Sequence, residues 1–130
     1  MPASWKSTFR DLLDIMPIPG YLFDPVSMHF VAANQSFCNL VGYPEPELIA
    51  LEWPHIMADG GETVRANEEI SGRQEDVFRA NDFAFLRKDG TRVNTHVQYR
   101  LMRVADGGGV TRQVYFAAVI SAQSESTFMR

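Results

Sequence analysis

The C-terminal third of the sequence constrains the fold most, because it contains two long stretches with different strand patterns. Arg92 to Val104 alternates between apolar and polar side chains, which is the period of two expected of a strand with one buried face. Arg112 to Ser121 carries apolar side chains on both faces. A strand of that kind needs cover on both sides, so we expect it at the centre of a sheet.

Turn signals join these stretches into a meander. Asp89-Gly90 is a typical hairpin pair because both residues tolerate positive φ, and it follows a predicted strand at Asp82–Lys88. A glycine-rich turn at Asp106–Gly109 separates the alternating strand from the closing one. The last third of the chain therefore predicts three consecutive antiparallel strands.

The chain begins with a predicted amphipathic helix and a hairpin. Apolar residues recur at helical spacing within residues 4–16 and form one stripe, and two prolines then end the helix. The stripe consists of Trp5, Phe9, Leu12, Leu13 and Met16. Two short predicted strands follow, at Tyr21–Phe23 and His29–Ala33.

Short helices connect the two groups of strands. Asn34 is a suitable N-cap for a helix at Gln35–Val41, and Gly42 is a suitable residue to end it. Further helical segments are predicted at Pro46–Leu51, Trp53–Asp59 (irregular or one turn) and Glu62–Ser71. A block of helices set apart from runs of strands predicts an α+β fold with an antiparallel sheet.

Composition excludes several classes of protein. A chain of 130 residues with 45% apolar residues has the size and core of one domain. Its apolar runs are about five residues long at most, too short for a membrane span. The net charge of −4 argues against binding nucleic acid through phosphates. The single cysteine, Cys38, excludes an intrachain disulfide and fits a cytoplasmic location.

Charge is distributed unevenly along the chain. Residues 1–86 contain 5 Lys/Arg and 13 Asp/Glu, whereas residues 87–130 contain 7 and 3. Two interpretations remain open. Arginines can keep a polar strand face soluble, or the late strands can present a basic face to an acidic partner or helix.

Four segments, in this order, resemble a PAS domain over roughly residues 17–121. They are Gly20–Asp24 as the opening strand, Val31–Tyr43 followed by Pro46–Leu48, Arg87–Thr91 as a hairpin, and Val114–Ile120 as the last strand. The chain departs from the family at Trp53–Glu62, where relatives commonly have His-Pro followed by an acidic pair.

The resemblance implies an α+β fold with a five-stranded antiparallel sheet in the order 2-1-5-4-3. Short helices on one face would enclose a small cavity. The N-terminal helix, residues 1–16, would cap the opposite face or form a homodimer with a second subunit through the stripe. Residues 17–121 would be the PAS domain, and residues 122–130 a linker or tail.

The same fold implies a set of residues around the cavity. Candidate ligand-pocket residues are Phe37, Trp53, His55, Met57, Val64, Asn67, Phe85, Val97 and Tyr99. Ligand pockets are mostly apolar with a few placed polar groups, and this set fits that description. The same set also describes an ordinary packed core, which is the favoured interpretation, and both stay open.

The cofactor is unknown from the sequence, and an apo domain is the first expectation. Haem-binding relatives use a histidine on the helix predicted at residues 62–71, which has none; His55 is the remaining candidate. Light-oxygen-voltage relatives carry a cysteine in a Gly-x-Asn-Cys-Arg-Phe-Leu-Gln stretch, which is absent here, so Cys38 is predicted to be structural. No spacing supports a metal site or a catalytic set.

The sequence therefore predicts a sensory or interaction domain of a bacterial-type signalling protein, not an enzyme. It would bind a small ligand or dimerise, and pass a conformational signal to an output domain. No nucleic acid partner is expected. The alternatives are a haem- or flavin-binding redox or gas sensor and a small α+β enzyme. The inward positions 93, 95, 97, 99 and 101 carry no carboxylate or histidine, which disfavours the enzyme.

Overall fold

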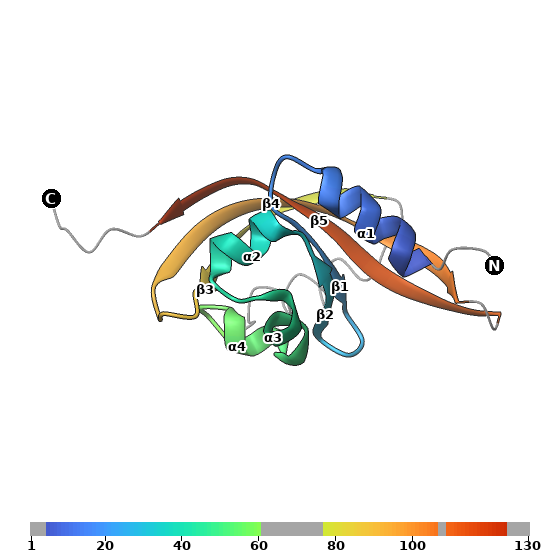
Figure 1. The fold of residues 1–130 in the computed structure, drawn as a ribbon, viewed down its shortest axis with the longest axis horizontal. Helices are drawn as coiled ribbons and strands as arrows, with labels where there is room; N and C mark the ends of the chain where they lie inside the picture. The colour runs from blue at the N-terminus through green and yellow to red at the C-terminus, as the bar shows by residue number, and fades with distance from the viewer. Residues whose placement is uncertain (1–4, 61–76, 107–108, 125–130) are drawn as a thin grey trace, which may run out of the picture.

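A computed structural model describes residues 5–60, 77–106 and 109–124 of the chain. The N-terminal half contains one longer helix, a strand pair and three short helices; the C-terminal half contains three long strands (Figure 1). In chain order these elements are α1 (Trp5–Ile15), β1 (Gly20–Asp24), β2 (His29–Ala33), α2 (Gln35–Val41), α3 (Glu45–Ala50), α4 (Trp53–Ile56), β3 (Phe78–Leu86), β4 (Arg92–Asp106) and β5 (Val110–Ser124).

The five strands form one antiparallel sheet in the order β2-β1-β5-β4-β3. The predicted fold class and strand order are therefore confirmed. β5 lies in the middle, between β1 and β4, as its two apolar faces predicted. β4 and β5 are the longest strands, with 15 residues each, and they form the curved spine of the molecule (Figure 1).

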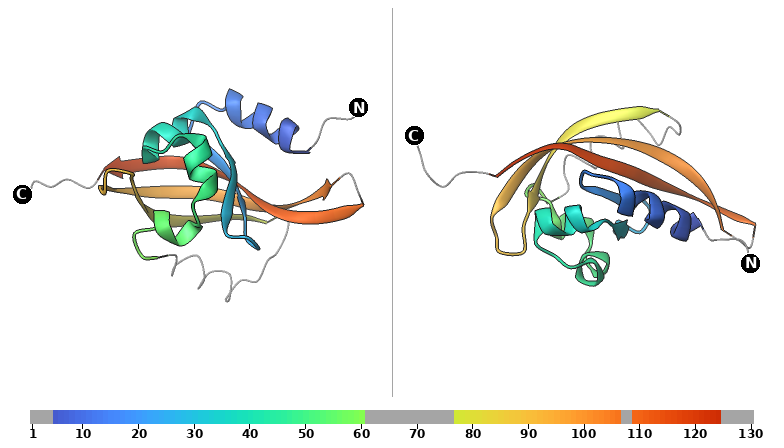
Figure 2. Two further views of the ribbon diagram at one scale, coloured as in Figure 1. Left: turned by 60° about the horizontal axis from the view of Figure 1, so that its bottom comes forward. Right: turned by 45° about the horizontal axis from the view of Figure 1, so that its top comes forward.

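The two faces of the sheet carry different cover. Helices α2, α3 and α4 lie on one face, which we call the cup face, and α1 lies on the other, the helix face (Figure 2). The main core is on the cup face and includes Phe37 of α2, Leu48 of α3 and Ile56 of α4. A smaller core under α1 is built on Leu13, Leu22 and Ala32.

Local signals set both ends of α2 as predicted, whereas α3 begins and ends one residue earlier than predicted. Asn34 caps α2 with its side chain, which accepts a hydrogen bond from the Phe37 backbone N–H at 2.9 Å. Gly42 ends the helix at φ 80°, a left-handed conformation that a residue without a Cβ adopts at little cost. Pro46 lies in the first turn of α3, where its missing N–H removes no helical hydrogen bond.

Several strand ends differ from the sequence prediction, most of all the start of β3 and the end of β5. β3 begins at Phe78, four residues before the predicted start, and β5 extends to Ser124. Both extensions are held by pairing with β4, which joins Phe78 to Arg100 and Ser124 to Val93. Their own residues are largely exposed, so no apolar alternation marks them.

β5 also contains an irregularity near its C-terminal end. The pairing with β4 runs from Ser121 opposite His96 directly to Val119 opposite Val97, so Ile120 is an extra residue. The bulge reverses the facing of β5 beyond that point and leaves Ile120 48% exposed.

The helix predicted at Glu62–Ser71 cannot be compared with the structure, because it lies outside the described residues. In the part of the chain that the structure describes, no helix is both long and apolar enough to cross a membrane.

Candidate functional site

An aromatic cluster fills the cup face. Trp53 is its centre: its ring centroid lies 4.1 Å from that of Phe23 and 5.1 Å from that of Phe30. The backbone N–H of Trp53 donates to the Met28 carbonyl at 2.8 Å, which fixes α4 against the β1–β2 turn. The buried rings of the cluster are Tyr21, Phe23, Phe30, Phe37, Trp53, Phe83, Phe85 and Tyr115.

Most of the predicted pocket residues meet in this cluster. Phe37, Trp53, Met57, Phe85 and Val97 are all buried in one core, and Tyr99 packs against it while half-buried. His55 lies apart from them, because its side chain on α4 is exposed. Val64 and Asn67 lie outside the described residues. The structure thus brings together six of the nine candidates.

One polar atom of the cluster has no partner. Trp53 is 2% exposed, and among the described residues no acceptor lies within hydrogen-bond distance of its Nε1. A buried donor left without an acceptor costs about 1–3 kcal/mol. The indole N–H is therefore a buried donor with unused capacity, surrounded by aromatic carbon. The sequence could place Trp53 in the core but did not indicate that its indole N–H lacks an acceptor.

Tyr21 is the second polar-tipped ring of the cluster. Burial raises the pKa of its phenol strongly, and the proximity of Tyr99 raises it further. The phenol therefore stays neutral over the range in which proteins remain folded. Tyr21 acts as an apolar ring on the cup face, with Phe37 at 4.7 Å and Phe30 at 5.2 Å.

Helix α1 docks on the opposite face through only part of its apolar stripe. Leu13 is 1% exposed, and Trp5, Phe9 and Met16 are partly buried around it. The Phe9 ring lies 5.6 Å from that of Phe116 on β5. Gly20 permits this close packing, because a Cβ there would lie 3.0 Å from Leu13 and 2.8 Å from Met16.

Leu12, the fifth residue of the stripe, does not take part in this packing. It is 43% exposed, and Ile15 beside it on the helix is 76% exposed. The apolar side of α1 is wider than the surface it covers. The sequence showed the stripe but not which part of it faces the sheet.

A buried amide connects α1 to the cup face. Asn34 is 3% exposed, and both ends of its side chain are fully used. The oxygen accepts from the backbone N–H groups of Gly20 at 3.0 Å and Phe37 at 2.9 Å. The nitrogen donates to the carbonyls of Leu13 at 3.0 Å and Ile18 at 2.9 Å. One side chain therefore joins the end of α1, the start of β1 and the start of α2.

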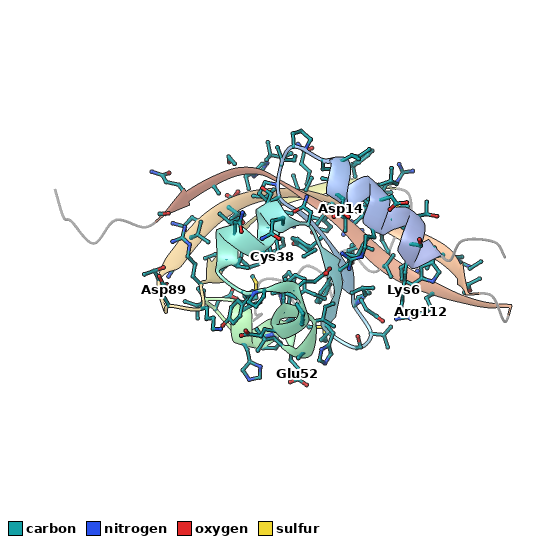
Figure 3. The ribbon with its side chains drawn as sticks, viewed as in Figure 1. Lys6, Asp14, Cys38, Glu52, Asp89 and Arg112 are labelled. Carbon is teal, nitrogen blue, oxygen red and sulfur yellow. The ribbon has the colours of Figure 1, made fainter. Side chains whose placement is uncertain are left out.

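Two ion pairs add to this connection. Arg10 of α1 pairs with Glu45, whose carboxylate also accepts from the Ala33 backbone N–H at 2.9 Å. Arg112 of β5, labelled in Figure 3, pairs with Asp24, and its guanidinium lies over the ring of Trp5 at 5.7 Å. The Glu45 hydrogen bond raises the pKa of Arg10, which remains charged.

Asp24 is 5% exposed, and its carboxylate is held by hydrogen bonds and an ion pair. Burial by itself would raise its pKa. The backbone N–H of Val26, the guanidinium of Arg112 and the backbone N–H of Ser27 outweigh burial and hold the pKa of Asp24 below its usual range. The carboxylate is thus charged at neutral pH, at the point where the β1–β2 turn, β5 and α1 meet.

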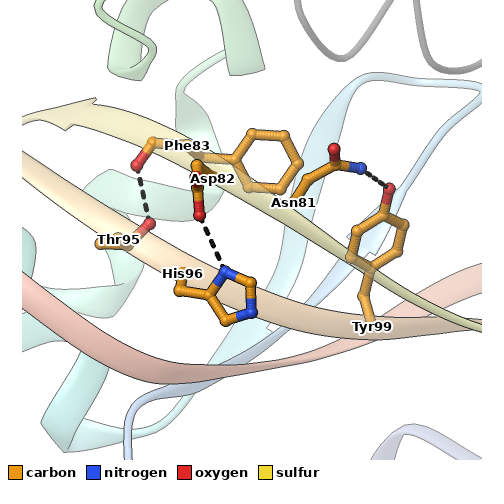
Figure 4. Close-up of polar contacts among 6 residues, drawn as sticks. All are labelled: Asn81, Asp82, Phe83, Thr95, His96 and Tyr99. Atoms are coloured by element: carbon orange, nitrogen blue, oxygen red, sulfur yellow. Dashed lines mark hydrogen bonds and ion pairs between the residues drawn. The ribbon is translucent and has the colours of Figure 1, made fainter.

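A hollow of about 720 Å³ lies beside β3, β4 and the last residues of β5, and the sequence did not predict it. Asp82 and His96 form a pair across β3 and β4 at 2.8 Å (Figure 4). Asn94 also lines the hollow. Two further contacts in this region are internal to the sheet: Thr95 donates to the Phe83 carbonyl, and Asn81 donates to the Tyr99 hydroxyl. Polar and apolar residues both line this hollow, whereas the cup-face core is mostly apolar.

Cys38 is a structural residue in this arrangement. It lies on α2, is 6% exposed and belongs to the cup-face core (Figure 3). Burial raises the pKa of its thiol, and the nearby Glu45 carboxylate raises it further. The thiol is therefore protonated and poorly nucleophilic at neutral pH. Among the described residues, no three potential ligands are grouped in a way that could hold a metal ion.

Comparison with known proteins identifies the fold. A family model described as "PAS domain" matches residues 19–120. No curated protein matches the chain.

Solved structures show the same architecture. The PAS domain of an HTR-like protein from Haloarcula marismortui is similar over 92% of this chain and 90% of its own, with a TM-score of 0.64 and 21% identity. A domain of a sensory box sensor histidine kinase/response regulator from Geobacter sulfurreducens covers 88% and 91%, with a TM-score of 0.61 and 16% identity. A Rhodobacter sphaeroides LOV protein covers 85% and 62%, with a TM-score of 0.63 and 16% identity.

Proposed function

Because the chain belongs to the PAS domain family, we propose that it is the sensory and interaction domain of a cytoplasmic signalling protein. In this proposal the cup face binds a small ligand, α1 mediates dimerisation, and the chain beyond β5 passes a conformational signal to an output domain. PAS domains are generally not enzymes, and we propose no catalytic role.

The observation that carries the ligand-binding proposal is the Trp53 indole. Its buried N–H has no acceptor among the described residues, while its ring contacts other aromatic rings. A small ligand with an apolar body and one hydrogen-bond acceptor would complement both features. The donor set disfavours haem, because His55 is exposed and His29 and His96 lie on strands outside the cup-face core. A covalent flavin adduct is also disfavoured, because the only cysteine, Cys38, lies on α2 and the sequence lacks the cysteine stretch of light-oxygen-voltage relatives.

The contacts of α1 support the signalling part of the proposal. Asn34 bonds both to Leu13 of α1 and to Phe37 of the cup-face core. A ligand that displaces α2 would weaken the same amide that holds α1. Such a ligand would shift the population between docked and released α1 in proportion to its differential affinity for the two states. Ligand binding on one face is thereby linked to the helix on the other.

Absorption across the near-ultraviolet and visible range and native mass spectrometry of freshly purified protein test ligand binding. A bound flavin or haem appears in the spectrum, and a colourless ligand appears as added mass. Trp53→Phe removes the indole N–H and keeps an aromatic ring, so we expect it to lower the bound fraction. Trp5→Phe makes the same change on α1 and should leave binding intact. Equal occupancy in both variants contradicts the role of Trp53.

Dimerisation is tested separately by measuring the mass in solution. The exposed Leu12 and Ile15 side chains on α1 support the proposal of a helix-mediated dimer. Leu12→Asp combined with Phe9→Asp should convert a dimer to a monomer while the sheet stays folded, as circular dichroism would report. A wild-type chain that is monomeric, or a double variant that remains dimeric and folded, contradicts this part of the proposal.

A further inference from the structure

One arginine contacts three separate parts of the fold at the end of the sheet far from α1. Arg87 directly follows β3 and donates from three nitrogens. Its Nε donates to the Leu40 carbonyl at 2.9 Å, one terminal nitrogen donates to Thr91 Oγ1 at 3.3 Å, and the other donates to Ser124 Oγ at 2.6 Å. Arg87 therefore connects α2, the β3–β4 turn and the last residue of β5.

The first of these contacts is at the C-terminal end of α2. The last carbonyls of a helix have no partner within it and carry partial negative charge. Here the hairpin supplies the donors, since Arg87 Nε binds the Leu40 carbonyl and the Lys88 backbone N–H binds the Val41 carbonyl at 3.0 Å. Helix α2 in turn presents Phe37 and Val41 to the cup-face core. A shift of α2 would therefore alter the contacts of Arg87.

The last contact is at the point where the chain leaves the sheet. β5 ends at Ser124, and the end of β5 lies alongside the β3–β4 hairpin (Figure 2). A guanidinium has a rigid, planar fork with five donors, so one side chain can hold several partners at once. A lysine in this position has a single ammonium and cannot reproduce that geometry.

We propose that Arg87 is a positioning residue that couples the placement of α2 to the pairing of the end of β5. This inference rests on the proposed function, because it supplies the route from the cup face to the chain beyond Ser124. When α2 moves away, Arg87 loses one anchor and holds Ser124 less firmly. When the end of β5 separates from the sheet, the C-terminal end of α2 loses its cap. The coupling is therefore reciprocal.

Hydrogen exchange in three variants tests the coupling. Arg87→Met should speed amide exchange at both ends of the coupling by about tenfold. The amides concerned are those of Gly42 and Lys88 beside α2 and those of the last residues of β5. A tenfold change corresponds to the loss of one net hydrogen bond, about 1.4 kcal/mol. Ser124→Ala alters β5 only, yet it should also speed exchange beside α2, by about twofold. Combined with Arg87→Met, it should add little. Lys88→Met is the matched control, because Lys88 pairs with Glu47 and should leave β5 unchanged.

Two results would overturn the coupling. One is that Ser124→Ala leaves the amides beside α2 unchanged; the other is that its effect is as large in the Arg87→Met background as in the wild type. If Arg87→Met does not fold, Arg87→Lys serves in its place, and it should protect one end at most. The experiment uses neither ligand nor output domain. A chain that binds no ligand but shows the coupling would contradict the proposed function and leave this inference standing.

Discussion

The two faces of the sheet differ in how they are covered and in how much apolar surface they bury. The cup face is covered by three short helices and contains a continuous cluster of buried rings around Trp53. The helix face is covered by one helix that buries Leu13 fully and its other apolar residues only partly. Polar contacts through Asn34, Glu45 and Arg112 supplement that small apolar patch.

The difference separates a core from a docked element. A buried aromatic side chain contributes roughly 1.5–3 kcal/mol, so the cup face supplies most of the stability. Helix α1 has 11 residues, and isolated helices of that length are marginal in water. Its helicity therefore depends on docking. Disrupting the cup face should unfold the domain, whereas disrupting the helix face should release α1 and leave the sheet intact.

The largest expected effect is at the centre of the cup face. Phe37→Ala removes a ring that is fully buried between Tyr21 and Phe85. We expect a loss of about 3–5 kcal/mol in the free energy of unfolding, measured with urea. Phe78→Ala is the matched control, since Phe78 is 73% exposed, and it should change stability by less than about 0.5 kcal/mol. Similar losses in both variants would contradict the assignment of the core.

The second effect is at the amide that joins the two faces. Asn34→Ala removes a helix cap and leaves the Gly20 N–H and the Leu13 and Ile18 carbonyls without their partner. We expect a loss of about 2–4 kcal/mol from the cap and the unsatisfied groups together. Asn34→Asp retains the cap acceptor but places a buried carboxylate oxygen against the Leu13 and Ile18 carbonyls, so its loss should be at least as large. An Asn34→Asp variant nearly as stable as the wild type would show that the cap alone accounts for the effect of Asn34.

The third effect is confined to the helix face. Leu13→Ala opens space under α1 and should cost about 2–3 kcal/mol, the lower end for a buried leucine because the helix can detach. Loss of α1 helicity by circular dichroism should occur before the urea transition of the sheet. Leu12→Ala, on the exposed side of the same helix, should change neither quantity. A single concerted transition in Leu13→Ala would show that α1 is part of the main core.

The smallest effect is electrostatic and depends on pH. The pKa of Asp24 is lower in the folded protein than in the unfolded chain. Its stabilisation is therefore complete above the unfolded-state pKa of about 4 and is lost as the pH falls through the folded-state pKa. Asp24→Asn should cost about 1–2 kcal/mol at neutral pH, and the difference from the wild type should shrink below about pH 4. Urea titrations at several pH values measure this.

Arg112→Met checks the cause of that pH dependence. Arg112 pairs with Asp24 and lies over the Trp5 ring. Without the guanidinium the folded-state pKa of Asp24 rises towards its unfolded value, so the acid-induced loss of stability should be smaller and should be complete at a higher pH. An unchanged pH profile would mean that the backbone N–H groups of Val26 and Ser27 alone account for the lowered pKa.

Local signals in the sequence were sufficient to predict the described helices and the central strand. Asn34 and Gly42 mark the ends of α2 through chemistry that acts within a few residues. The two apolar faces of β5 reflect cover on both sides and so could be read without a structure. The ordered motifs resembling a PAS domain supplied the strand order, and the match over residues 19–120 agrees with them.

Long-range contacts were beyond the sequence. The pairs Arg10–Glu45 and Asp24–Arg112 join residues 35 and 88 positions apart, and nothing in one sequence selects them among many charges. Two pairs, Asp24–Arg112 and Lys88–Glu47, match part of the basic excess of residues 87–130 with acids of the first half. The exposure of Leu12 depends on the orientation of α1, which its own stripe does not fix.

The grouping of most candidate pocket residues could be predicted, but their individual contacts and exposure could not. Apolar and aromatic character placed Phe37, Trp53 and Phe85 together, and the structure confirms that they share one core. The same character could not separate them from His55, whose side chain is exposed. The unpaired Trp53 N–H and the three contacts of Arg87 are properties of the assembled fold and have no counterpart in local sequence.

Native-state hydrogen exchange at increasing urea concentration tests most directly whether the two faces are separate units. The account predicts that amides of α1 exchange through a local opening, with a lower free energy and a weaker dependence on urea than amides of β1 and β5. Amides of the sheet should exchange only through global unfolding. If α1 and the sheet exchange with the same free energy and the same urea dependence, the domain is one cooperative unit and α1 is not a detachable element.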